Sequence, residues 1–156
     1  LPDDDLLSLL TAEVDAVDGV SVESIRVVDP DRTDASLSAL ARGAALAECG
    51  ADERLDVLIN GIRRFAETDW VVVLRDGAPV AEVGDTPELG WLTAFLAGSE
   101  HLDGLDDSAP SDLLWAHLIG SNLTIAAGRA FHPIHERERV RFSLLARLAD
   151  ALITGG

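Results

Sequence analysis

The spacing of hydrophobic positions along the chain changes between two periods, one typical of helices and the other of strands. Hydrophobic residues recur every three or four positions in several segments, which predicts helices at 3–17, 35–48, 52–66, 86–100 and from Pro133 to about Ile153. Alternating or continuous apolar runs bounded by turn residues predict strands at 20–28, 70–74, 79–83, 112–119 and 123–130.

The order of these elements predicts the fold class. A helix and a strand are followed by two helices, a hairpin, a helix, a loop at 101–111, two strands and a final helix. The pair Asp76–Gly77 favours a tight hairpin turn. We therefore expect an α+β fold with a mainly antiparallel sheet flanked by helices. The stretch "DPDRTD" at 29–34 breaks the pattern and predicts an αβ appendage at 1–30 before a domain at 31–156.

Composition narrows the classes of function. The 156 residues are 47% hydrophobic and carry a formal net charge of −16, so we expect a folded protein that binds neither nucleic acid nor a membrane surface. The longest apolar runs are far shorter than a membrane span. The absence of lysine excludes a P-loop and Schiff-base catalysis. The single Cys49 and the lack of an opening signal segment predict a cytoplasmic location, and no cofactor is indicated.

Several motifs in the second half of the chain resemble those of GAF domains. They are "WVVVLRDG" at 70–77, "LTIAAGRAF" at 123–131, and "ERERVRFSLLARLADALI" at 136–153, where the family has a strand, a corner and a long closing helix. The resemblance implies a GAF-like domain over about residues 35–153. In that family a ligand lies between the sheet and the segment that crosses its face, here 86–111.

The opening "LPDDDLLSLLTAEVDAVDGVSVESIRVV" at 1–28 is similar to the second half of an ACT domain, with a closing helix, a "VDGV" turn and a strand. Regulatory proteins of the actinobacterial type pair such a half with a GAF-like half. The two resemblances imply a non-enzymatic regulatory or signalling module that binds a small-molecule effector, forms a homodimer, or does both. A structural protein-interaction module without a ligand is the alternative.

Trp91, Trp115 and His117 are the candidate ligand-binding residues. Trp115 and His117 are two positions apart in a predicted strand and therefore share one face of the sheet. If the crossing segment covers that face, His117 is a polar group in a cavity lined by aromatic rings. The competing interpretation is an ordinary core histidine with a satisfied hydrogen bond.

His132 and His135, in "HPIH", are three positions apart and would share one face of a helix. A metal would need a third ligand, for which Glu138 is the available candidate. The alternative is a helix start, in which Pro133 occupies the first helical position and His132 caps it. We expect no metal. A small enzyme that uses His117 or this pair as a general base remains a further alternative.

Arg129, Arg137 and Arg141, together with Arg139, form the one basic cluster of an acidic chain. Their side chains could bind an anion or an acidic partner surface. The alternative is a solvated face with local pairing, such as Glu138 with Arg141.

The last predicted helix carries a broad apolar stripe, which favours pairing with a second copy of the chain. The predicted dimer helix residues are Val140, Leu144, Leu148 and Leu152.

Overall fold

The computed structural model describes residues 8, 12–13, 34–99 and 110–155. The chain divides into two compact units, Leu1–Thr33 and Asp34–Gly156. In the first unit the described residues, at positions 8, 12 and 13, are helical. The predicted strand at 20–28 and most of the ACT-like half lie outside the described residues, as does most of the predicted loop at 101–111.

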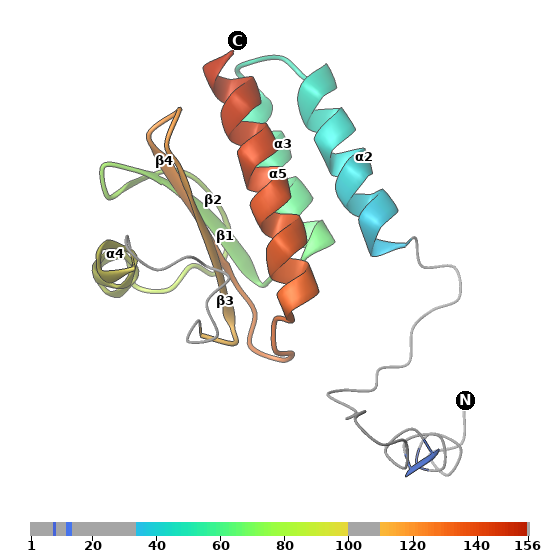
Figure 1. Cartoon of the computed structure of the whole chain (residues 1–156). Coiled ribbons are helices and arrows are strands. Elements are labelled where there is room, and N and C mark those ends of the chain that lie inside the picture. The colour runs from blue at the N-terminus through green and yellow to red at the C-terminus, as the bar shows by residue number, and fades with distance from the viewer. Residues whose placement is uncertain (1–7, 9–11, 14–33, 100–109, 156) are drawn as a thin grey trace. The chain divides into compact units, whose positions relative to one another are not determined.

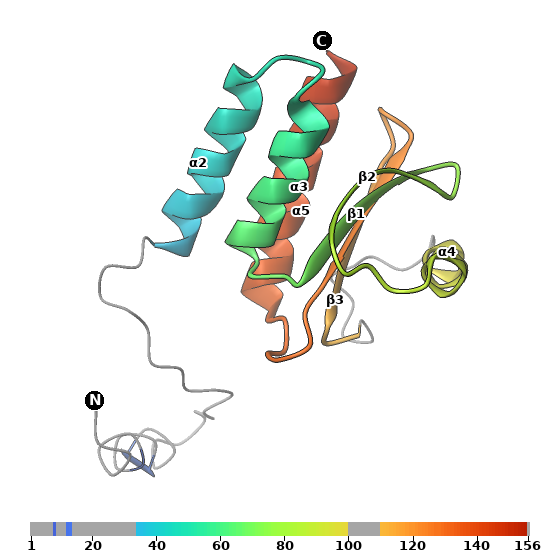
Figure 2. The same cartoon turned by 180° about the vertical axis from the view of Figure 1, so that it is seen from behind.

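The second unit is an α+β domain, as the order of predicted elements indicated. Its strands form one antiparallel sheet in the order β2-β1-β4-β3. Helices α3 and α5 cover one face of this sheet and α4 lies on the other, while α2 packs outside α3 and α5 (Figures 1 and 2). The elements are α2 (Ala35–Glu48), α3 (Arg54–Phe65), β1 (Trp70–Arg75), β2 (Ala78–Gly84), α4 (Leu89–Gly98), β3 (Leu113–Leu118), β4 (Leu123–Gly128) and α5 (Glu136–Thr154).

The first hairpin confirms the turn predicted from the sequence. Asp76 and Gly77 both have positive φ, 52° and 78°, which is the backbone that a two-residue hairpin turn requires. Strand β1 lies between β2 and β4, and its apolar run is buried on both faces because helices cover both sides of the sheet. Val71 and Val73 face the core under α3 and α5, whereas Val72 contributes to the smaller core under α4. A continuous apolar run is the expected sequence for such a central strand.

The starts of α4 and α5 differ from the prediction. Helix α4 begins at Leu89 rather than near Thr86, because Thr86 donates its amide to Gly84 and belongs to the turn after β2. Helix α2 has the predicted bounds, and its C-cap residue Cys49 is extended. Helix α5 begins at Glu136, and Pro133 lies in the loop before it.

The turn between β3 and β4 is hydrogen-bonded to α5 through one carboxylate. Asp150 accepts hydrogen bonds from the amides of Gly120 and Ser121 at 2.9 and 2.8 Å, and from the Ser121 hydroxyl at 2.7 Å. Burial raises the pKa of Asp150, but these hydrogen bonds outweigh it and hold the pKa below its ordinary value. The β3–β4 turn therefore has a fixed position on the helix layer.

Candidate functional site

Arg129 is a buried structural residue and not part of an exposed basic patch. It follows β4, is 6% exposed, and uses every guanidinium nitrogen. Two hydrogen bonds, at 2.9 and 2.8 Å, join it to both carboxylate oxygens of Glu138. Three more reach the carbonyl oxygens of Ala66, His132 and Pro133 at 2.7 to 2.9 Å. The side chain thus ties the end of α3, the loop after β4 and the first turn of α5 together.

The hydrogen bonds of Arg129 to these elements form a clasp, and Glu138 connects this clasp to the start of α5. Its carboxylate also accepts the amide of the N-cap residue His135 at 2.9 Å, as in a capping box. Burial raises the pKa of Glu138, whereas the hydrogen bond and charge of Arg129 and the His135 amide lower it, and the pKa lies below its ordinary value. The predicted local pair of Glu138 with Arg141 is replaced by this pair with Arg129.

Of the four clustered arginines, two remain available for a partner. Arg139 is 8% exposed and donates to the carbonyl of Leu113 at 2.7 Å and to that of Pro110. Its burial lowers its pKa from the ordinary value. Arg137 is exposed and Arg141 is half-buried on α5. The predicted anion or partner patch is therefore reduced to Arg137 and Arg141.

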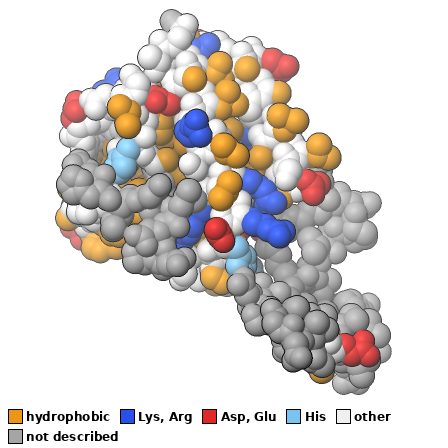
Figure 3. All heavy atoms as spheres, in the orientation of Figure 1, with side chains coloured by type: hydrophobic (Ala, Val, Ile, Leu, Met, Phe, Trp, Pro, Cys, Tyr) orange, Lys and Arg blue, Asp and Glu red, His pale blue; other side chains and the backbone are white. Residues whose placement is uncertain are grey.

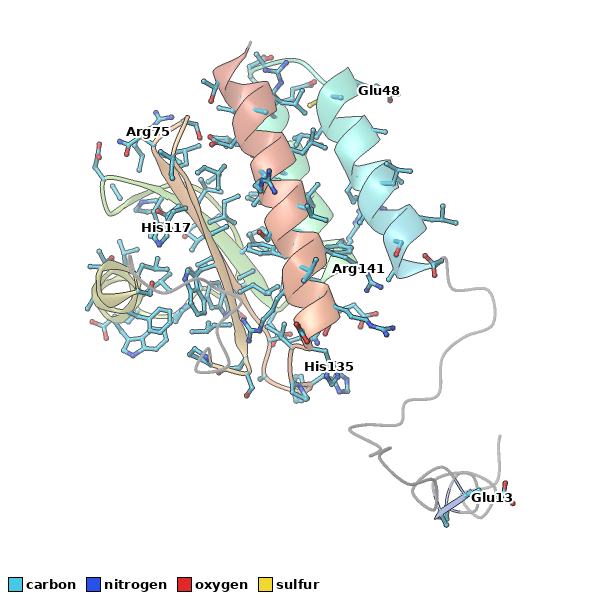
Figure 4. The ribbon with its side chains drawn as sticks, viewed as in Figure 1. Glu13, Glu48, Arg75, His117, His135 and Arg141 are labelled. Atoms are coloured by element: carbon cyan, nitrogen blue, oxygen red, sulfur yellow. The ribbon has the colours of Figure 1, made fainter. Side chains whose placement is uncertain are left out.

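The histidine pair does not share a helical face. His132 lies in the loop, and its carbonyl accepts from Arg129, while His135 caps α5. Among the residues that the structure describes, no group of three or more His, Cys, Asp or Glu side chains is placed to hold a metal ion. His135 is at the lower end of α5 and His117 is on the sheet (Figure 4).

Trp115 and His117 lie on the α4 side of the sheet, but only Trp115 is buried. Trp115 is 5% exposed and contacts Phe95 edge to face, with ring centroids 5.2 Å apart. Phe95 in turn stacks on Trp91, at 5.8 Å, and Trp91 is 51% exposed. His117 is exposed, and its Nδ1 lies 3.1 Å from the Thr124 hydroxyl on the paired strand. The three predicted residues thus differ in burial: Trp115 belongs to the smaller core, whereas Trp91 and His117 are exposed.

A cleft of about 610 Å³ opens at one end of the sheet, where β1 and β3 begin and β2 and β4 end. Of the predicted residues, Trp91 and Arg129 line it, but Trp115 and His117 do not. The lining residues are Arg63, Thr68, Asp69, Trp70, Asp85, Pro87, Trp91, Asp112, Leu113, Arg129 and Ala130. Sequence reasoning missed most of them, although the aspartates that flank predicted strands were a usable signal.

Helix α5 exposes three residues of its predicted stripe, Val140, Leu144 and Leu148, at 40%, 56% and 42%. Leu152 is half-buried and packs against the main core. A second stripe, which the sequence analysis did not propose, is formed by Leu37 and Leu40 of α2, at 60% and 70% exposed. Their separation of three positions in an alanine-rich helix was the available signal.

The domain defined by these observations is an α+β sheet domain with an exposed apolar helix face and a polar cleft at the sheet end. Comparison of the chain with protein-family models, curated proteins and solved structures finds no match. None of the helices in the described part of the chain is long and apolar enough to cross a membrane.

Proposed function

We propose that this chain is a non-enzymatic regulatory module that acts by self-association through the apolar face of α2 and α5. The observation that carries the proposal is the apolar surface that these two helices share. The resemblance of about residues 35–153 to GAF domains, and of 1–28 to an ACT half, supports the regulatory part of the proposal. Exposed contiguous apolar surface of this kind is typical of interaction sites.

The two stripes belong to one surface because α2 and α5 are in close contact. A Cβ on Gly43 would lie 2.8 Å from Cδ2 of Leu148, so the glycine allows that leucine to lie against α2. Both helices run in the same direction in Figures 1 and 2. Leu40 precedes Gly43 by about one turn, as Leu144 precedes Leu148, so the leucines of both helices run in step. Figure 3 shows hydrophobic side chains gathered over these helices, with arginines among them.

Charge favours a second copy in an antiparallel orientation. Arg141 lies near the N-terminal end of α5, whereas Glu48 ends α2 at the opposite end of the face (Figure 4). A two-fold axis between the two faces and perpendicular to the helices would pair each helix with its own copy in antiparallel, so the arginine end of one protomer would lie over the C-terminal end of its partner's apolar face. There both Glu48 and the negative end of the helix dipole attract a cation.

Sedimentation velocity on the full chain at tens of micromolar tests the proposal. We expect a dimer, with Leu40→Glu and Leu144→Glu each shifting it to monomer. Ile119→Glu is the matched control, since Ile119 is 90% exposed on the β3–β4 turn, away from this face, and should leave the dimer intact. A monomeric wild-type chain would refute self-association and favour a module that binds a different protein. Equal effects of all three variants would refute the α2 and α5 face as the interface.

The orientation has its own test. Glu48→Arg and Arg141→Glu should each weaken the dimer, because each places like charges opposite one another. The double variant should regain most of the lost association if the two side chains face each other across the axis. A dimer that is indifferent to both charge reversals would contradict the antiparallel arrangement but not the apolar interface.

A further inference from the structure

The cleft at the sheet end gathers carboxylates because of the strand register. Trp70 pairs with Gly84 and with Gly128, and Leu113 also pairs with Gly128. Asp69, Asp85 and Asp112 directly adjoin these paired positions, so the antiparallel ladder brings all three to the same end of the sheet. This gathering is independent of the helix face used in the proposed dimer.

The negative charge of the cleft is only partly compensated. Arg129 lines it but is already paired with Glu138. Burial lowers the pKa of Arg139, whereas the negative charge of Asp112 raises it and favours the charged form of Arg139. Asp69 accepts the amide of Ala130 at 2.9 Å, which orients its carboxylate without neutralising it. Asp69 and Asp85 form no ion pair with any described residue, and Arg63 is the one lining arginine left to oppose them in the described part of the chain.

Two tryptophans supply aromatic surface beside these carboxylates. The ring of Trp70 lies against Gly128, where an added Cβ would be 2.5 Å from Cζ2, so the missing side chain makes room for the ring. Trp91 is stacked on Phe95 and remains half exposed at the cleft. Indole rings with nearby carboxylates are the combination that attracts organic cations.

Thr68 adds an unsatisfied polar group. The residue lines the cleft and is 5% exposed, and its hydroxyl oxygen has no hydrogen-bond partner. Buried hydroxyls without a partner are rare in folded proteins, and this one belongs to a residue of the cleft wall. The cleft volume of about 610 Å³ lies within the range of about 300–1,000 Å³ that small-molecule sites occupy.

We propose that this cleft binds a small organic cation carrying an ammonium group, with Asp69 and Asp85 facing the charge and Trp70 and Trp91 contacting its alkyl groups. Such a molecule matches both the uncompensated carboxylates and the aromatic surface. An anionic ligand would meet Arg63 as the one lining arginine that is not paired with a carboxylate in the described part of the chain.

Choline is a suitable probe, and its neutral carbon isostere 3,3-dimethyl-1-butanol is the matched control. Titration of the full chain, followed by tryptophan fluorescence and calorimetry, should show saturable choline binding that weakens as salt is added. The neutral isostere should bind about tenfold more weakly or not at all. Equal affinity for the two probes, or saturation by neither at millimolar concentration, would overturn the proposal.

Two variants locate the site. Asp85→Asn and Trp91→Leu should each weaken choline binding by roughly threefold to tenfold. Asp56→Asn, at an exposed position of α3, is the control and should leave the affinity unchanged. Unaltered binding in both cleft variants, with native circular dichroism, would contradict this placement. If a trimethyl-lysine peptide binds far more tightly than choline, the ligand of the cleft is a protein segment and not a small molecule. Because the dimer variants lie on another surface, loss of association and loss of choline binding can be distinguished.

Discussion

Removal of Arg129 should destabilise the domain more than any change of an exposed arginine. Arg129→Met keeps an unbranched side chain but removes all five hydrogen bonds of the guanidinium. It leaves Glu138 without its cation and three carbonyls without a donor. Breaking a buried pair from one side costs about 3–5 kcal/mol, and we expect a loss in that range. Arg129→Lys restores the charge but not the five-donor fork, so about half of the loss should remain.

Glu138→Gln tests the same clasp from the other side. The amide keeps one oxygen for Arg129 but removes the negative charge, so we expect a loss of about 1.5–3 kcal/mol. The folded-state pKa of Glu138 is depressed below its ordinary value of 4.5. Its contribution is therefore complete above that value and disappears as pH falls through the folded pKa. The difference between wild type and Glu138→Gln should shrink in the same pH interval.

Urea unfolding followed by tryptophan fluorescence measures these losses. Trp70, Trp91 and Trp115 are the chain's three tryptophans, so the signal reports the second unit alone. Measurements at several protein concentrations separate the loss of unfolding free energy within the domain from any change in dimerisation. Glu136→Gln, an exposed acid in the same first turn, should cost less than about 0.5 kcal/mol. A loss below about 1 kcal/mol for Arg129→Met would refute the clasp. So would a double variant of Arg129→Met and Glu138→Gln whose loss of unfolding free energy equals the sum of the two single losses.

Two further predictions concern the ends of the sheet. Gly84→Ala should cost more than about 2 kcal/mol in urea unfolding, because φ is +83° and a Cβ would overlap the Asp69 carbonyl; wild-type stability would contradict that close approach. Asp150→Asn should cost about 1 kcal/mol near pH 7 by weakening the bonds to Gly120 and Ser121. Since the pKa of Asp150 is lowered, this difference should vanish as pH falls below its ordinary value of 3.8, and a constant difference would exclude the charge as its cause.

Much of the second unit could be predicted from the sequence because its signals are local. The Asp76–Gly77 turn fixes the hairpin, and the doubly buried run of β1 identifies a central strand. Helix starts were less reliable, since Thr86 and Pro133 are good local start signals, yet both residues lie in loops, where they are hydrogen-bonded to Gly84 and Arg129. A capping residue competes with every other acceptor and donor that the fold brings near it.

The candidate sites depend on long-range placement. The cleft combines residues from α3, both ends of the β1–β2 hairpin, α4 and the strands near residues 112 and 129. No spacing rule relates these segments, so only the register of the sheet reveals the cleft. For His117, the face of the strand was predicted correctly from the alternation of residues along it. That alternation does not show whether α4 reaches as far along the face as His117.

The arginines show why composition gives a poor estimate of the basic surface. Arg129 and Arg139 bind backbone carbonyls at element ends, and Arg54 donates to the carbonyl of Leu152 at 2.5 Å. A planar group with several fixed donors suits this task, whereas an ammonium group carries its three donors on one nitrogen and cannot reach such widely separated carbonyls. Such arginines are unavailable to a partner. The cations that remain on α5 include Arg137 and Arg141, beside the apolar stripe, which is where an acidic partner surface would gain most from them.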